Sequence, residues 1–264
     1  MIEYDAATFV DSHCHIPQLI DSGGGTLEAI LDRAKAAGVA RMLSAGIDLE
    51  SFPRLLEIAE QHEEVYVSAG IHPNHLAAIC DGVADALKSC AVHRRVIGVG
   101  ETGLDYFHHE VAPAMQRDRF REHIRVARTI GKPLIVHLRD AGDDLFRILA
   151  EEHAEEVGGV MHCFTGGAQE ASRALDLGFY LSFSGIITFK TAAALRRIAE
   201  TVPLSRILIE TDSPWLSPEP QRGKRNEPAL VRHVAEAVAA CQGISLAEVA
   251  AATTANFDRL FRLH

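Results

Sequence analysis

The feature that most constrains the fold is a series of eight short apolar, β-branched segments along the 264-residue chain. They start at Phe9, Arg41, Val65, Val96, Pro133, Gly159, Phe179 and Ile207. Their starts lie roughly 20 to 40 residues apart, which is the length of a strand followed by a helix. Eight strands that alternate with helices predict an α/β protein, a (β/α)8 TIM barrel.

Segments with helical periodicity fill the gaps between these strands. One begins after Thr26, an expected N-cap, and stops at Gly38, and a later one runs from Met115 to Gly131. Two more, 228–241 and 245–261, follow the last strand segment. Because no linker or low-complexity segment interrupts the alternation, we expect one domain over residues 1–264.

The charge of the chain limits the partners that it can bind. The formal net charge is −10, whereas general affinity for nucleic acid depends on a basic surface. A phosphate-bearing substrate would therefore have to be held by a local group of basic residues.

Cysteine usage and the amino-terminal segment indicate the compartment. The five cysteines (Cys14, Cys80, Cys90, Cys163 and Cys241) match neither a zinc ribbon nor a redox pair, so reduced thiols are expected. The first ten residues do not resemble a signal peptide, and no run approaches the roughly 20 apolar residues of a membrane span. We expect a cytoplasmic protein without a membrane contact or an obligate protein partner.

Polar side chains recur where the predicted strands end. His13 and His15 are two residues apart on the first strand and so point to the same side. Polar residues often end strands, but that would account for one or two positions only. Active sites of (β/α)8 barrels lie at the carboxyl ends of the strands, where we expect His13, His15, His72, Glu101, His137, His162 and Asp212.

The other histidines are expected to be less informative. Six fall in helical or terminal segments, where a solvated surface position is expected: His62, His93, His123, His153, His233 and His264. His75, His108 and His109 lie in predicted loops and could belong to either group.

Imidazoles and carboxylates at strand ends predict a metal centre. These ligands suit Zn, Mn, Fe or Ni, whereas Mg and Ca prefer oxygen ligands. Four of these imidazoles and the two carboxylates are the expected ligands: His13, His15, His137, His162, Glu101 and Asp212. Six ligands are too many for one tetrahedral zinc site with an open position, but they could serve two ions about 4 Å apart. Glu101 is the anionic residue suited to bridge them, and Asp212 could bind one ion and also hydrogen-bond a water between the two.

The polar segments also resemble a known family. "DSHCH", "GIHP", "GETGLDY", "HLRDA", "MHCFTG", "ETDSPWL" and "RGKRNEP" occur in this order over nearly the whole chain, and the series resembles the TatD family of metal-dependent hydrolases within the amidohydrolase-like TIM barrels. The resemblance implies that one ion is held by His13, His15 and Asp212 and a second by His137 and His162, with Glu101 bridging both. It also implies magnesium-dependent deoxyribonuclease activity, including 3′-to-5′ exonuclease activity.

The resemblance further suggests residues that bind substrate. Arg222, Lys224 and Arg225 of "RGKRNEP" and Arg139 after the fifth strand could clamp phosphates, or they could be solvated surface. His72 is expected to contact the phosphate or the leaving group.

Three functions follow from these observations. The first is a two-metal phosphodiesterase acting on DNA, with Asp212, Glu101 and His72 as catalytic residues. The second is a metal-dependent ester or amide hydrolase, such as an aminoacyl-tRNA deacylase. This activity depends less on the basic residues of "RGKRNEP", which we call the basic loop. The third is a metal-binding scaffold without catalytic function.

Overall fold

Eight strands lie in one sheet in chain order. In the computed structural model, which describes residues 8–75, 82–108 and 110–263, each predicted strand segment overlaps one of them, and the second strand begins at Val39, two residues before the predicted start at Arg41. They are β1 (Phe9–Cys14), β2 (Val39–Ser44), β3 (Val65–Ala69), β4 (Val96–Asp105), β5 (Leu134–Arg139), β6 (Gly159–Met161), β7 (Tyr180–Phe183) and β8 (Ile207–Ile209). This parallel order, alternating with helices, is that of a (β/α)8 TIM barrel, so the predicted fold class is confirmed. Cys80, His109 and His264 lie outside the described residues.

Helices separate the strands along the chain. They are α1 (Ile16–Asp21), α2 (Leu27–Ala36), α3 (Phe52–Gln61), α4 (Val83–Ala91), α5 (Pro113–Ile130), α6 (Gly142–Glu151), α7 (Ala168–Asp176), α8 (Ala193–Thr201), α9 (Val231–Gln242) and α10 (Leu246–Phe261). The predicted end signals hold: the Thr26 side chain accepts a hydrogen bond from the Ala29 amide at 3.3 Å, and Gly131 ends α5 with a φ of 69°.

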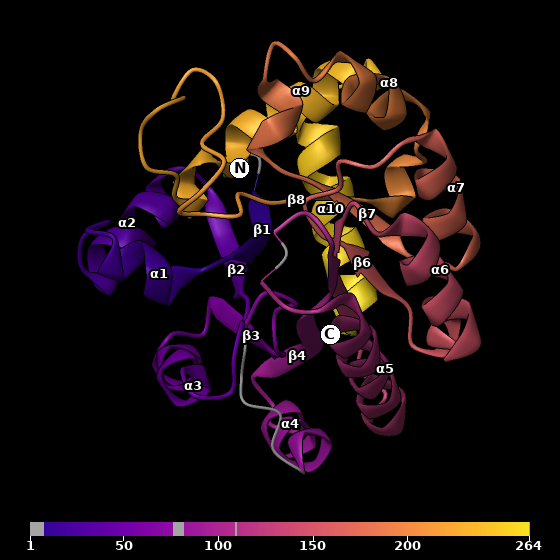
Figure 1. The fold of residues 1–264 in the computed structure, drawn as a ribbon. Helices are drawn as coiled ribbons and strands as arrows, with labels where there is room; N and C mark the ends of the chain where they lie inside the picture. The colour runs from indigo at the N-terminus through magenta and orange to yellow at the C-terminus, as the bar shows by residue number, and fades with distance from the viewer. Residues whose placement is uncertain (1–7, 76–81, 109, 264) are drawn as a thin grey trace. The chain divides into compact units, whose positions relative to one another are not determined.

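Two compact units divide the chain. The first unit contains residues up to 43 and from 182 onward. Within it, α10 packs on β1 and β8, and α8 lies beside α9 (Figure 1). Phe9, Phe183 and Phe257 are fully buried in this unit, so the apolar faces predicted for its strands and last helix form its core.

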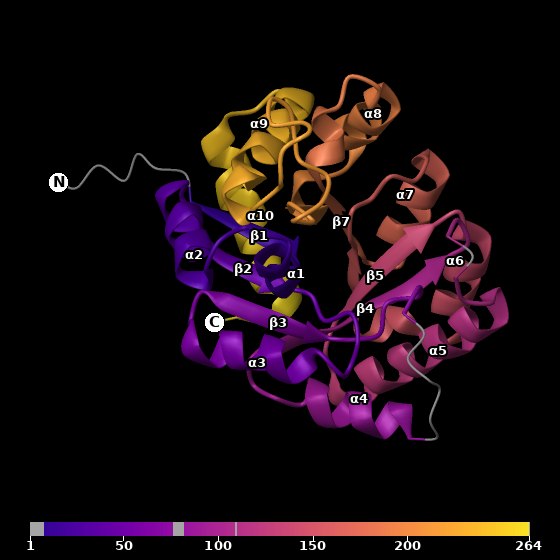
Figure 2. The same ribbon diagram turned by 60° about the vertical axis from the view of Figure 1, so that its left-hand side comes forward.

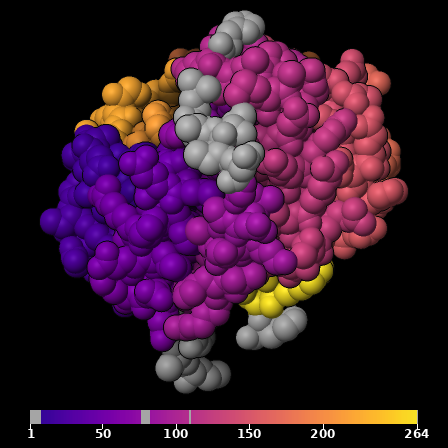
Figure 3. Space-filling model, turned by 60° about the horizontal axis from the view of Figure 1, so that its bottom comes forward, coloured from indigo at the N-terminus to yellow at the C-terminus, as the bar shows by residue number. Residues whose placement is uncertain are grey.

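The second unit contains residues 44–181. Here β3, β4, β5 and β6 pair in parallel, and Figure 2 shows β4 and β5 side by side. Gly103 is opposite His137 in that pairing. A Cβ atom at Gly103 would lie 2.0 Å from the His137 carbonyl oxygen, so only glycine allows this close approach. Figure 3 shows one face of the molecule, on which this unit is drawn in colours from purple to pink.

His123 is not a solvated surface residue, which corrects the sequence prediction. Its side chain is fully buried in α5, on the same stripe as Phe120 and Ile124. Its Nε2 accepts a hydrogen bond from the Ile71 amide at 3.0 Å, so Nδ1 carries the hydrogen and donates to the Arg119 carbonyl at 2.8 Å. Burial lowers the pKa of His123 to about 4, and the neutral ring thereby fixes the backbone that precedes His72.

No single helix within the described part of the chain is long and apolar enough to cross a membrane. The segments Pro228–Gln242 and Leu246–Phe261 would meet the length and composition only if counted together, and they are bent by 108° at the break between them.

Candidate metal centres

The first unit brings His13, His15 and Asp212 together, and we call these three residues the first cluster. The Nε2 atoms of the two histidines are 3.1 Å apart. A carboxylate oxygen of Asp212 lies 3.3 Å from His15 Nε2 and 3.9 Å from His13 Nε2. Both histidines are buried, and the Asp212 side chain is 15% exposed. Two imidazole nitrogens and one carboxylate oxygen therefore face one small space.

Backbone hydrogen bonds between β1 and the segment after β8 build this geometry. The Asp212 amide donates to the His13 carbonyl at 2.9 Å, and the His15 amide donates to the Ser213 carbonyl at 2.8 Å. These two bonds connect the backbone of His13 and His15 to the backbone of Asp212 and Ser213. The side chains of the cluster therefore start from fixed positions.

Asp11 reinforces that arrangement, and it is not among the site residues predicted from the sequence. One of its carboxylate oxygens accepts from the amides of Thr211 and His13, at 2.9 and 3.3 Å, and the other accepts from the Thr211 hydroxyl at 2.5 Å. Burial raises the pKa of Asp11 well above its ordinary value. Asp11 thus braces the backbone next to both His13 and Asp212, and no local pattern marks a hydrogen bond between residues 200 positions apart.

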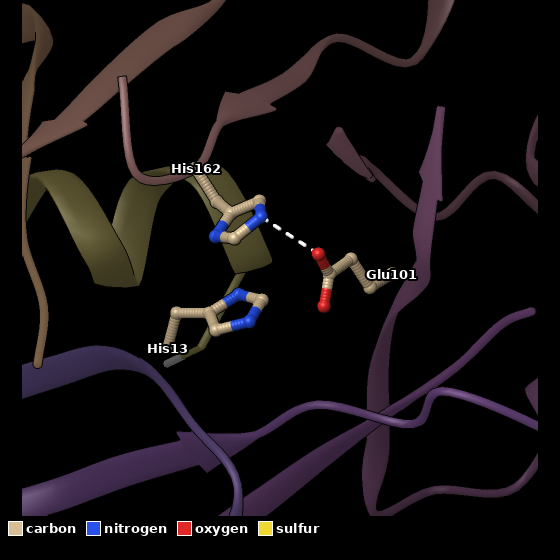
Figure 4. A group of neighbouring side chains, drawn as sticks. All are labelled: His13, Glu101 and His162. Atoms are coloured by element: carbon tan, nitrogen blue, oxygen red, sulfur yellow. Dashed lines mark ion pairs between the residues drawn. The ribbon is translucent and has the colours of Figure 1, made fainter. Parts of the chain in front are cut away.

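The second unit gathers Glu101, His72, His137 and His162, which we call the second cluster. One oxygen of Glu101 lies 2.8 Å from His162 Nε2, 3.0 Å from His137 Nδ1 and 3.3 Å from His72 Nε2. Figure 4 shows Glu101 on β4 facing His162, which follows β6; the third residue labelled there, His13, comes from β1 of the first unit. Three imidazoles therefore converge on one buried carboxylate.

Glu101 and His137 differ slightly from the predicted positions. Both lie inside their strands, β4 and β5, and not at the strand ends. His72, His162 and Asp212 lie just beyond β3, β6 and β8. β4 is long because its pairing with β5 continues to Asp105 and Arg139, so Glu101 falls within the paired region.

Asp105 contacts the His137 ring at Nε2, the nitrogen that does not face Glu101. Its carboxylate is fully buried and accepts from His137 Nε2 at 3.2 Å, from His108 Nδ1 at 2.7 Å and from Asn74 Nδ2 at 2.8 Å. Burial alone would raise the pKa of Asp105, but these hydrogen bonds outweigh it and hold the pKa well below its usual range. The ionised carboxylate fixes the His137 ring so that Nδ1 faces Glu101.

The sequence does carry a signal for Asp105. Asp105 is four residues after Glu101 on the same strand, and residues an even number apart point to the same side of a strand. The same periodicity pairs His13 with His15. The partner Asn74, 31 residues away, has no comparable signal.

We expect Asp105→Asn to weaken divalent metal binding by roughly 10- to 100-fold, the usual effect of losing a carboxylate that orients a metal-binding histidine. The dissociation constant for Mn²⁺, measured by calorimetry on chelator-treated protein, tests this. Asp144→Asn is the matched control, because that carboxylate contacts Tyr106 and Arg147. Equal Mn²⁺ affinity in the Asp105 variant and wild type would contradict the role.

The donor atoms of both clusters suit divalent ions. His13, His15 and Asp212 form one group whose ligand atoms lie within 4.8 Å of one another, and His72, Glu101 and His137 form another. Nitrogen and carboxylate oxygen donors at such spacing fit Zn, Mn, Fe or Ni. His137 also has the carboxylate partner typical of metal-binding histidines.

The surroundings shift the pKa values of two histidines of the second cluster in opposite directions. Burial lowers the pKa of His72, although Glu101 opposes this. For His137, burial acts in the same direction, but hydrogen bonds to Asp105 and Glu101 outweigh it and raise the pKa. The amide of Asn74 donates to His72 Nδ1 at 3.1 Å, so the neutral His72 ring carries its hydrogen on Nε2.

Of the residues predicted to bind substrate, His72 belongs to the second cluster, and the basic residues lie on the exposed surface of their units. Arg139 is exposed, with its guanidinium 4.8 Å above the Phe107 ring. The Arg222 guanidinium lies 3.8 Å above the Phe189 ring, and Lys224 donates to Gln221 Oε1 at 3.0 Å. The buried Asn226 side chain donates to the Thr211 and Trp215 carbonyls, which braces the loop that carries Arg222 and Lys224.

A (β/α)8 barrel with histidine and carboxylate clusters of this kind defines a class, the metal-dependent hydrolases with an amidohydrolase-like fold. The family model described as "TatD related DNase" matches residues 10–262. The chain therefore belongs to the family of TatD-related DNases and is a metal-dependent hydrolase, as the sequence motifs predicted.

Relatives and solved structures agree with this assignment. The chain is 42% identical to "Uncharacterized metal-dependent hydrolase YcfH" of Escherichia coli K12 over 255 residues, 96% of each chain. It is 34% identical to "3'-5' ssDNA/RNA exonuclease TatD" of Cronobacter sakazakii over 239 residues, which are 89% of this chain and 91% of the relative. The crystal structure of YjjV, a TatD homologue from Escherichia coli K12, matches with a TM-score of 0.89 and 30% identity, covering 98% of this chain and all of YjjV.

Proposed function

We propose that this protein is a two-metal phosphodiesterase, a deoxyribonuclease of the 3′-to-5′ exonuclease type, whose single hydrolase domain spans the chain. The observation that carries the proposal is the presence of two clusters, each of which offers at least three metal-ligand atoms within 4.8 Å. We assign His13, His15 and Asp212 to one divalent ion and Glu101, His137 and His162 to the other. The sharing of Glu101 by both ions stays a prediction.

The ions, when bound, would polarise a phosphoryl oxygen and lower the pKa of a water molecule. The chain itself would supply the proton transfer and the orientation. Asp212 would accept the proton of the attacking water at its carboxylate. His72, which carries its hydrogen on Nε2, would donate a hydrogen bond to a phosphoryl oxygen or to the leaving group.

Support for a nucleic-acid substrate comes from outside the clusters. The relative from Cronobacter sakazakii is named as an exonuclease of single-stranded DNA and RNA. In a chain of net charge −10, the exposed Arg222, Lys224 and Arg139 are suited to hold phosphates. We propose DNA as the substrate and the cytoplasm as the location.

The function is tested with protein loaded with Mn²⁺, Zn²⁺ or Mg²⁺ and end-labelled single- and double-stranded DNA and RNA, with sizing of the products over time. We expect single nucleotides to be released in sequence from the 3′ end of DNA. Hydrolysis of a small neutral ester without any cleavage of nucleic acid would instead establish the ester hydrolase. Tight metal binding without turnover of either substrate would establish the scaffold.

The basic loop separates a phosphodiesterase from a hydrolase of neutral substrates. Replacing both Arg222 and Lys224 with Ala should weaken DNA binding by about 1.5–3 kcal/mol for each charge-assisted hydrogen bond to phosphate that is removed. Fewer counterions would be released, so the slope of log affinity against log salt should become shallower by roughly 1.4 for single-stranded DNA. Binding to a labelled oligonucleotide across a salt series measures both effects.

The double variant Lys35→Ala and Arg232→Ala is the matched control, because it removes the same charge from the exposed surfaces of α2 and α9. Metal content should equal that of wild type in both double variants. Identical salt slopes for the two double variants would show that the loop contributes only net charge.

A further inference from the structure

Trp215 is a large apolar side chain that stays half in water beside the first cluster. It is the only tryptophan of the sequence, and 50% of it is exposed. Its ring meets the ring of His15 at a centroid distance of 5.1 Å and an angle of 67°. A single exposed apolar side chain is common on protein surfaces, but this one places the exposed part of an aromatic ring beside a candidate metal ligand.

The backbone of Trp215 is firmly held. Its amide donates to the Asp212 carbonyl at 3.1 Å, and its carbonyl accepts from the side chain of Asn226 at 2.6 Å. Asn226 is fully buried and also donates to the Thr211 carbonyl at 2.8 Å. The indole is thus mounted on the same braced segment as Asp212, so little backbone ordering would be needed for it to bind a ligand.

The exposed aromatic residues lie next to the clusters or to residues that support them. In the described part of the chain, the large hydrophobic side chains that are exposed are Val92, Phe107, Met115 and Trp215. Both aromatic members adjoin a cluster or its support: Trp215 touches His15, and the Phe107 amide donates to Asp105 at 3.0 Å. Exposed aromatic rings combined with basic side chains are how proteins bind single-stranded nucleic acid without sequence preference.

We propose that Trp215 is a stacking platform for a nucleobase of single-stranded nucleic acid, adjacent to the phosphate that binds at the metal-loaded first cluster. The proposal rests on the proposed nuclease function and adds how the substrate is positioned. A base fits because it offers a flat ring attached through its sugar to a phosphate, so one ligand can reach the metal-loaded cluster with its phosphate and cover the indole with its base. Since every base has a stacking face, the platform tolerates any sequence.

The single tryptophan allows a direct test in the wild-type protein. The probe is a short oligothymidylate with phosphorothioate linkages, which slow hydrolysis, added to the metal-loaded enzyme. Trp215 emission should be quenched by this probe. The quenching should fall when the same probe lacks the base of the 3′-terminal or the penultimate nucleotide.

Two substitutions then separate stacking from hydrophobic contact. Trp215→Phe keeps an aromatic face, whereas Trp215→Leu keeps an apolar side chain without one. On unmodified oligothymidylate, kcat/KM should stay within about threefold of wild type for the Phe variant and fall by roughly 10- to 100-fold for the Leu variant. On the substrate that lacks the stacked base, all three proteins should have equal kcat/KM.

The outcomes separate this proposal from the function on which it rests. Metal-dependent cleavage with unchanged emission, and equal rates for the Phe and Leu variants, would overturn the platform and leave the nuclease intact. Failure of the metal-loaded wild type to cleave or bind any oligonucleotide would overturn both. Loss of bound metal in the Leu variant would show that the indole supports His15, which also overturns the platform.

Discussion

Replacing Glu101 with Ala should reduce turnover by at least roughly 100-fold, because this single carboxylate oxygen lies within 3.3 Å of nitrogens from three histidines. Losing a carboxylate that only orients a ligand already costs about 10- to 100-fold in metal affinity or activity. A residue that binds the ion itself should cost at least as much. The measurement is kcat together with elemental analysis of protein prepared without chelator.

The metal content also tests the predicted bridge. If Glu101 is shared by two ions, Glu101→Ala should lower the affinity for both, whereas a ligand of one ion would leave the other in place. Glu101→Gln is the matched variant, since it keeps the volume and one oxygen but removes the charge. Circular dichroism and thermal unfolding check that the buried substitution has not unfolded the chain. Full metal occupancy and full activity in the Ala variant would exclude Glu101 from the site.

Replacing Asp212 with Asn should lower kcat by roughly 100- to 10,000-fold, the range that general acid–base catalysis contributes. The amide keeps the shape of the side chain but cannot accept the proton of the attacking water. KM should change much less, because the residues proposed to bind phosphate are untouched. Assays at saturating metal, with metal content measured, separate this effect from the loss of a ligand.

The pH dependence gives a second readout for Asp212. The kcat of Asp212→Asn should stay below that of wild type at every pH of the profile, because the amide accepts no proton at any pH. Asp258→Asn is a control within the same unit, since that carboxylate pairs with Arg41. An unchanged kcat of the Asp212 variant across the whole profile would remove Asp212 from the mechanism.

Local periodicity was sufficient to predict much of the fold and part of the site. The eight apolar runs identified the eight strands because a strand buried on both faces is apolar throughout. The spacing of His13 and His15 placed both on one side of β1, and their Nε2 atoms are 3.1 Å apart. His123 shows the limit of residue type as a guide to burial: a histidine in a helix is usually solvated, but its position on the buried stripe of α5 predicts burial.

What the sequence determined, then, was the order of the strands and the residue types at their ends, because these depend on interactions over a few positions. What only the tertiary structure decided was how those side chains are held. Asp11 reaches Thr211 across 200 positions, and Asn226 ties Trp215 to the segment of Asp212. Such hydrogen bonds depend on which backbones the parallel sheet places side by side, and bonds between distant segments leave no periodic trace in a single sequence.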